Sequence, residues 1–155
     1  MDDKYFTPTD DIVCKLYLEC MDKYFADMVL PITIIMTEDM KHNAGVYEWE
    51  VDSTGMFLKS VIKITCHYQF TKEILEEVMV HEMLHALAIS IDHRRYHTHG
   101  RLWKKMADDF NLRYGLNITK HLNIYKLPLA PRNPDKTDVG KKHSLKNFLS
   151  KLISR

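Results

Sequence analysis

The chain has 155 residues, of which 45% are apolar and 28% are charged, as is usual for a single soluble globular domain. It has no run of about 18 apolar residues, and it begins with the acidic, polar stretch MDDKYFTPTDD, so we expect neither a transmembrane helix nor a secretory signal. The net charge is +1, yet residues 126–155 hold eight Lys and Arg against two Asp, which predicts a basic tail on a weakly acidic body.

The N-terminal half predicts one helix followed by a small sheet. Thr9 is a plausible N-cap, and apolar residues then recur at helical spacing, which predicts a helix over about 10–28. Pro31 interrupts this pattern. Short β-branched or alternating segments predict three strands, with a turn between the second and the third. The strands are expected at residues 32–36, 44–51 and 61–65, and the turn at residues 52–55.

A second helix is predicted over about 72–91, with Thr71 as its N-cap. Its central part is apolar on most sides, which is typical of a helix buried by its neighbours. The polar residues in that central part are His81, Glu82 and His85.

The remaining elements are a loop, a third helix, a short strand and a tail. Residues 92–100 are polar and have no periodicity, whereas residues 100–114 again show helical spacing. A short strand is predicted over residues 117–127, and prolines punctuate the sequence after it. We therefore predict a domain over residues 1–127 and a basic tail over residues 128–155.

The spacing of His81 and His85 predicts a catalytic metal site. Residues i and i+4 share one face of a helix, so both imidazoles can bind one ion. Glu82 then lies beside the metal, where a general base would take a proton from a zinc-bound water and deliver it to a leaving amine. Burying three such groups without partners would cost roughly 1–3 kcal/mol each. A metal removes that cost, so we favour a zinc site over histidines satisfied by hydrogen bonds in an ordinary core.

The third ligand stays open on the residues alone. A catalytic zinc usually has three protein ligands and one open position. Ala88 and Ile91 stand where the HExxHxxGxxH pattern needs glycine and histidine, and no glutamate follows Glu82. His99 lies where the loop enters the third helix, so packing of that helix can hold its side chain in place. The candidates are Asp92, Asp108, Asp109, His93, His97, His99, His121 and His143.

Several motifs together resemble the SprT-like metalloprotease domain of the Spartan DNA–protein crosslink proteases. HEMLHA is followed, after a loop of about a dozen residues, by His99-Gly100-Arg101-Leu102-Trp103. The match extends to Ala44-Gly45-Val46 and Asn117-Ile118-Thr119, and it covers roughly residues 10–125. The resemblance implies an α+β, zincin-like metalloprotease fold, with a small β-sheet packed on helices and an HExxH active-site helix.

The resemblance also implies the site and the substrate. Zn²⁺ would be held by His81, His85 and His99, and Glu82 would act as the catalytic acid and base in peptide-bond hydrolysis. The substrates would be proteins bound or crosslinked to DNA, and DNA would switch the activity on. The family often carries a cysteine zinc ribbon after the protease domain. This chain has no CxxC pair, so we expect that ribbon to be absent.

Contacts to single-stranded or branched DNA are expected from two basic segments. One is the loop after the HExxH helix, and the other is the tail, where residues 144–153 could form a short amphipathic helix. The residues concerned are Arg94, Arg95, Lys141, Lys142, Lys146, Lys151 and Arg155.

Two other functions compete with a DNA-dependent protease. One is an intracellular metallopeptidase with a different protein substrate and no DNA dependence. The other is a non-catalytic DNA-binding module stabilised by zinc, against which Glu82 argues because a structural zinc needs no base beside it. Three scattered cysteines favour free thiols in a reducing compartment. We therefore expect a monomer with no membrane partner in the cytoplasm or nucleus, or in the host cytoplasm if the protein is viral.

Three aromatic residues have a structural and a functional interpretation. Tyr96, like His97, could stabilise an oxyanion near the metal, but we favour a solvated loop. Trp103 is expected in the core, because it lies on the apolar face of the third helix. Trp49, on an alternating strand, is assigned to packing rather than to stacking on a base.

Overall fold

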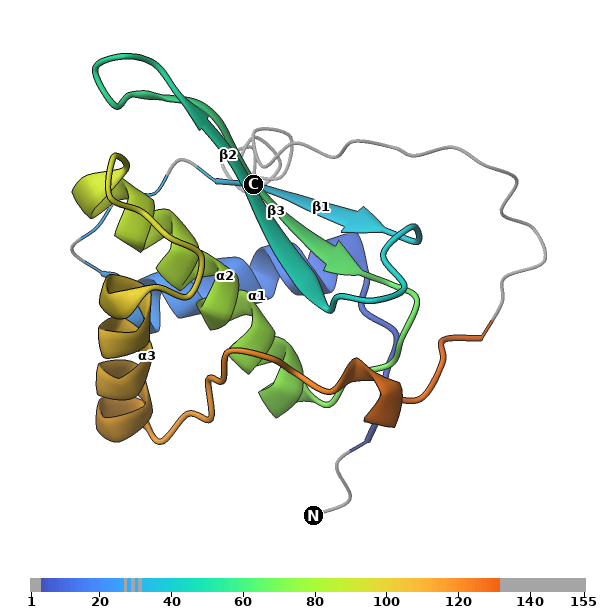
Figure 1. Cartoon of the computed structure of the whole chain (residues 1–155). Helices are drawn as coiled ribbons and strands as arrows, with labels where there is room; N and C mark the ends of the chain where they lie inside the picture. Colours follow the sequence, from blue (N-terminus) through green and yellow to red (C-terminus); the bar gives the residue numbers. More distant parts are fainter. Residues whose placement is uncertain (1–3, 27, 29, 31, 132–155) are drawn as a thin grey trace, which may run out of the picture.

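The computed structural model describes residues 4–26, 28, 30 and 32–131. The predicted tail helix and Lys141, Lys142, Lys146, Lys151 and Arg155 lie outside the described residues. Within them, three α-helices and a three-stranded sheet confirm the predicted α+β class (Figure 1). None of the described helices is long and apolar enough to cross a membrane. The elements are α1 (Asp10–Tyr24), β1 (Thr33–Thr37), β2 (Gly45–Val51), β3 (Phe57–Thr65), α2 (Lys72–Asp92), α3 (Arg101–Tyr114) and the 3₁₀ helix η1 (Ile124–Lys126).

The sheet has the strand order β1-β3-β2, so β3 is central and β2 lies at an edge. β1 runs parallel to β3 and β2 runs antiparallel to it. The predicted turn joins β2 to β3, because the Asp52 carboxylate accepts hydrogen bonds from the backbone N–H groups of Thr54 and Met56, at 2.8 and 3.0 Å. This Asx-type turn sets the antiparallel pairing, and among the described strands the other edge of β2 has no partner.

The caps of the first two helices agree with the sequence. Thr9 accepts a hydrogen bond from the Ile12 N–H, and Thr71 accepts one from the Ile74 N–H. The predicted end of the first helix at residue 28 is wrong. Phe25 already has φ −132° and ψ 25°, and its N–H bonds back to the Met21 carbonyl. Its ring is 1% exposed, so packing of Phe25 decides where α1 ends.

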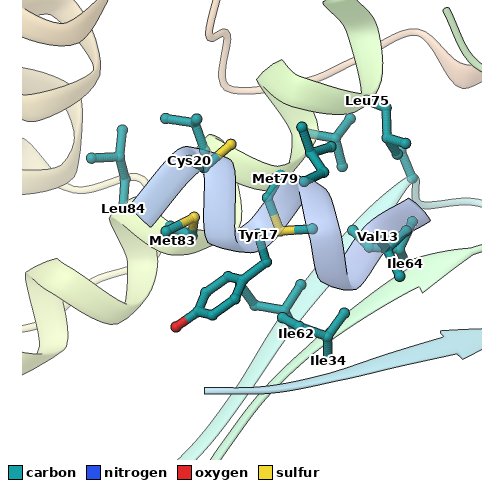
Figure 2. Packing of buried hydrophobic residues seen from close by; sticks show 14 of the residues in the cluster. Val13, Tyr17, Cys20, Ile34, Ile62, Ile64, Leu75, Met79, Met83 and Leu84 are labelled. Carbon is teal, nitrogen blue, oxygen red and sulfur yellow. The ribbon is translucent and has the colours of Figure 1, made fainter. Parts of the chain in front are cut away.

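Helices α1 and α2 cover one face of the sheet and enclose the core (Figures 1 and 2). Ile62 and Ile64 of β3 are fully buried. Helix α3 packs on the far side of α2 (Figure 1). Its Phe110 also contacts Phe25 at the end of α1, with ring centroids 5.2 Å apart. Because α2 lies between the sheet and α3, it is buried on most sides, as its composition predicts. The labelled core residues in Figure 2 are Val13, Tyr17, Cys20, Ile34, Ile62, Ile64, Leu75, Met79, Met83 and Leu84.

Residues 117–130 form an arm that crosses α2 and returns to the β3–α2 loop (Figure 1). The strand predicted over residues 117–127 is wrong, because these residues form irregular backbone and the 3₁₀ helix η1. Side chains take the place of a strand partner. The Asn111 amide both donates to the Ile118 carbonyl, at 2.9 Å, and accepts from the Ile118 N–H, at 2.7 Å. The far end of the arm is fixed where the Gln69 N–H donates to the Pro128 carbonyl.

Candidate metal centre

Helix α2 brings His81 and His85 together on one face, as the spacing predicts. Their Nε2 atoms lie 3.1 Å apart. The central part of this helix is mostly buried, and His85 itself is only 5% exposed. Two imidazole nitrogens therefore face one another at the border between the core and an open cleft.

The third histidine of the cluster is His99, which precedes α3. Its Nε2 lies 3.0 Å from the Nε2 of His81. Of the described residues, these three histidines form the cluster whose ligand atoms all lie within 4.8 Å of one another. His99 has a φ of 51°, in the left-handed region that residues other than glycine seldom adopt. Such local strain is often found at functional sites, where the surrounding fold compensates for it.

Trp103 forms the floor under the three histidines. It follows His99 by one helical turn, and its ring stacks on His85 with centroids 5.3 Å apart and an interplanar angle of 22°. The His81 and His99 rings also lie within 5 Å of it, at 4.7 and 4.5 Å. Trp103 is 3% exposed, which confirms core packing. The aromatic residue after the His-Gly pair therefore shields the histidines from the interior side.

Two outer groups contact the histidine nitrogens that face away from the cluster. The Nδ1 of His81 lies 3.0 Å from the Thr119 carbonyl of the arm, and the Nδ1 of His85 lies 2.7 Å from the Tyr96 hydroxyl. A fully solvated loop was the wrong prediction for Tyr96, which is half-buried, whereas His97 is exposed as expected. The sequence showed only a tyrosine in a polar loop, and nothing in it placed the hydroxyl beside His85.

Burial keeps the three histidines neutral. Burial, together with the neighbouring histidines, lowers the pKa of His81 to about 4 and that of His85 to about 3. Burial likewise lowers the pKa of His99. Neutral imidazoles offer the lone pairs that a metal needs. Tetrahedral zinc with Zn–N bonds of about 2.0–2.1 Å would need ligand nitrogens about 3.3 Å apart, so the observed spacings of 3.0 and 3.1 Å fit such an ion.

Glu82 is buried beside the cluster, against the edge strand β2. It is 5% exposed. Burial raises the pKa of Glu82 to about 8, although a hydrogen bond with the Tyr47 backbone acts in the opposite direction. A Cβ on Gly45 would lie 2.9 Å from Glu82 Oε1 and 3.0 Å from a methyl group of Val78. Glycine at this position therefore lets β2 approach the carboxyl, which is the physical reason for the Ala-Gly-Val motif.

The histidines and Glu82 open into a cleft of about 440 Å³ between β2 and the arm. One wall carries the aromatic residues Tyr47, Trp49 and Tyr96, and the Trp49 ring meets Tyr96 edge-on with centroids 5.8 Å apart. The opposite wall carries Lys120 and His121 of the arm. A cleft of this size, with its polar groups gathered at one point, is suited to holding part of an extended chain.

The other candidate ligands lie elsewhere. His93 lies against the β2–β3 turn at Gly55, and Asp92 bonds to Arg95. His121 is exposed, with its ring centroid 5.8 Å from that of His99. Asp108 and Asp109 belong to α3, where Asp109 pairs with Arg113. His143 lies outside the described residues.

The two predicted nucleic-acid contacts in the loop, Arg94 and Arg95, are exposed. Neither is among the residues that line the cleft. The Arg95 guanidinium lies 3.7 Å from the Asp92 carboxylate. A role for them in DNA binding stays a prediction, as does a domain boundary near residue 127.

We expect the metal-free protein to be most stable near pH 6.5. The pKa values of His81 and His85 lie below their ordinary value of 6.5, so the unfolded chain binds more protons and stability is lost as the pH falls below 6.5. The pKa of Glu82, at about 8, lies above its ordinary value of 4.5, so the contribution of the neutral carboxyl is lost as the pH rises towards 8. Between pH 6.5 and 8 the free energy of unfolding should fall by about 1–2 kcal/mol.

Urea unfolding in the presence of a chelator, from pH 5 to 8, measures this profile. Glu82→Gln is the matched control, because it removes the titrating group and should abolish the decline above pH 6.5. An equal decline in wild type and variant would show that Glu82 is not its cause.

Comparison with known protein families matches residues 14–121 to the SprT-like family. No curated protein matches the chain significantly. The matched segment runs from α1 to the arm, and it includes the three clustered histidines, Glu82 and Gly45. It makes up more than two thirds of the sequence, and the family implies a metalloprotease-like domain in which a histidine cluster could hold a metal ion. The chain therefore belongs to the SprT-like family.

Proposed function

We propose that this protein is a zinc-dependent endoprotease with a zincin-like fold. The observation that carries the proposal is the convergence of three neutral imidazole nitrogens beside the buried carboxyl of Glu82, at the floor of an open cleft. A structural metal site is usually closed by four protein ligands, whereas a catalytic one keeps a position open. Three ligands facing a cleft favour the catalytic kind.

His81, His85 and His99 would hold the metal. Zinc is the favoured ion because it accepts three imidazoles in tetrahedral geometry, and the nitrogen spacings fit that geometry. When bound, zinc supplies Lewis acidity, which acidifies water and polarises a carbonyl group.

Glu82 would move the proton. As the carboxylate it accepts a proton from the attacking water, and as the acid it returns that proton to the leaving amine. Its position against Gly45 keeps the carboxyl close to β2 and away from bulk water. Ionisation of a carboxyl with a raised pKa is favoured by a nearby dication, so metal binding would prepare Glu82 to act as a base at neutral pH.

The substrate would be a polypeptide in extended conformation. Among the described strands, β2 pairs only with β3 and lines the cleft through Gly45, Val46, Tyr47 and Trp49. An extended chain can add to such an edge by backbone hydrogen bonds, without a requirement for a particular sequence. The scissile peptide would then pass between Glu82 and the histidines.

Proteins bound or crosslinked to DNA are the proposed substrates, and single-stranded or branched DNA is the proposed activator. The resemblance to Spartan-type proteases supports this, as does the excess of Lys and Arg in residues 126–155. We also propose that the enzyme is intracellular and monomeric.

A cleavage assay tests the proposal. The zinc-loaded full chain would be incubated with a basic DNA-binding protein, with and without single-stranded DNA, and fragments would be followed on a gel. We expect cleavage in the presence of DNA, and loss of cleavage when a chelator removes the metal. Cleavage independent of DNA would support a metallopeptidase without a DNA-directed role. A zinc-loaded protein that cleaves nothing in either lane would support a non-catalytic, zinc-stabilised module.

A further inference from the structure

Tyr96 lies between the cleft and the outer nitrogen of His85. It belongs to the loop that joins α2 to α3, and its hydroxyl is 2.7 Å from His85 Nδ1. The residue is half-buried and lines the cleft. Its ring plane stands almost perpendicular to the His85 ring, at 87°, and the hydroxyl lies at hydrogen-bond distance from the nitrogen.

The position of Tyr96 is supported from β2. The Trp49 ring packs edge-on against Tyr96 at an interplanar angle of 88°, and Trp49 is itself half-buried. A contact chain therefore runs from the edge strand, through Trp49 and Tyr96, to His85 on α2. Trp49 is too exposed to be a core residue, so we assign it to packing against Tyr96.

The direction of the Tyr96 hydrogen bond follows from metal binding. The Nε2 of His85 faces the Nε2 of His81 inside the cluster. A nitrogen that binds a metal must offer its lone pair, so the single proton of the neutral imidazole then resides on Nδ1. Nδ1–H donates, and the Tyr96 hydroxyl oxygen accepts.

We propose that Tyr96 is a positioning residue for the metal centre, a role that rests on the proposed function of the histidine cluster. By accepting a hydrogen bond from the Nδ1–H of His85, it holds the tautomer and ring orientation that present Nε2 to the ion. The Thr119 carbonyl does the same for His81 at 3.0 Å, but a backbone group cannot be removed by substitution. Substitution of Tyr96 can therefore test how an outer hydrogen-bond partner of a histidine affects zinc affinity.

Tyr96→Phe removes the accepting oxygen and keeps the ring that packs on Trp49. We expect zinc affinity to fall about 10–100-fold, the usual effect of losing an outer partner of a ligating histidine. Tyr47→Phe is the matched control. It removes a hydroxyl from a tyrosine that also lines the cleft, but that hydroxyl bonds to Ser60 at 2.9 Å and to no histidine, so zinc affinity should stay within about threefold of wild type.

Zinc affinity would be measured on the full chain by competition with a chelator, with thermal unfolding of each metal-free variant to verify its fold. A second measurement needs no variant. Long-range ¹H–¹⁵N NMR of the zinc-loaded wild type should place the His85 proton on Nδ1 and show slow exchange of that proton with water.

The outcomes separate this inference from the proposed function. Tight zinc binding by wild type and equal affinity in Tyr96→Phe would overturn the role of Tyr96 and leave the metal centre standing. A His85 proton on Nε2 in the zinc-loaded protein would also overturn it, whether or not the variant folds. If the wild type binds no zinc, or if His81→Ala leaves its zinc affinity unchanged, the metal centre itself is overturned. The inference would be established if Tyr96→Phe binds zinc more weakly, Tyr47→Phe does not, and the proton of His85 lies on Nδ1.

Discussion

Replacing Glu82 with glutamine is expected to lower kcat/KM for peptide-bond cleavage by about 10³-fold or more, while zinc affinity stays within about threefold of wild type. General acid–base groups contribute roughly 10²–10⁴-fold, and Glu82 would act in both proton transfers. The amide has nearly the same volume as the carboxyl, so it fits the buried space against Gly45. Chelator competition and a fluorogenic peptide assay on the same preparations measure the two quantities.

Glu77→Gln is the matched control for Glu82. Glu77 lies on α2 one and a half turns earlier and also lines the cleft, but its carboxylate accepts a hydrogen bond from the Asn117 N–H at 2.9 Å. Glutamine can keep that bond through its side-chain carbonyl. We expect Glu77→Gln to retain most of the kcat. Equal losses in both variants would mean that a general change in the cleft, and not the loss of a proton carrier, explains the effect.

His99→Ala is expected to lower zinc affinity by about 10³-fold and to abolish cleavage. The binding free energy of structural zinc in zinc-finger peptides is about 10–16 kcal/mol. On that scale each of three ligands accounts for about 4 kcal/mol, which corresponds to about 10³-fold in the dissociation constant. Removing His99 would leave only the two histidines of α2. The affinity would be measured at pH 7.5, where the three histidines are neutral in the folded chain.

His97→Ala is the matched control for His99. The two residues lie in the same loop and both were candidates for the third ligand, but His97 is exposed and is not part of the cluster. Its substitution should change zinc affinity by less than about threefold. A large loss in His97→Ala, with His99→Ala unaffected, would show that the loop rearranges to present a different ligand when metal binds.

Local physics explains which elements could be predicted from the sequence. Thr9 and Thr71 cap their helices because the accepting oxygen and the donating N–H are only three residues apart. Asp52 forms its turn through similarly local bonds, to the N–H groups two and four residues further on. The end of α1 was predicted too late because burial of Phe25, and not helix propensity, ends the helix. The strand predicted over residues 117–127 failed because its backbone partners are side chains of α2 and α3.

The sequence by itself determined the pairing of the two α2 histidines and the position of Glu82. His81 and His85 are one helical turn apart, so any helix through these residues places them on one face. The apolar residues around them required that helix to be buried, and burial keeps both histidines neutral. These properties depend on a helix and its immediate surroundings, and they needed no long-range information.

The tertiary structure alone decided which distant groups complete the site. On spacing alone, several residues of the loop and beyond could have reached the metal; the left-handed backbone of His99 and the start of α3 bring that residue to the cluster. The tertiary structure also placed Tyr96 on His85 and the Thr119 carbonyl on His81. Such contacts depend on how the loops cross a buried helix. Packing between residues far apart in the sequence sets the path of these loops, and no periodicity in the chain encodes it.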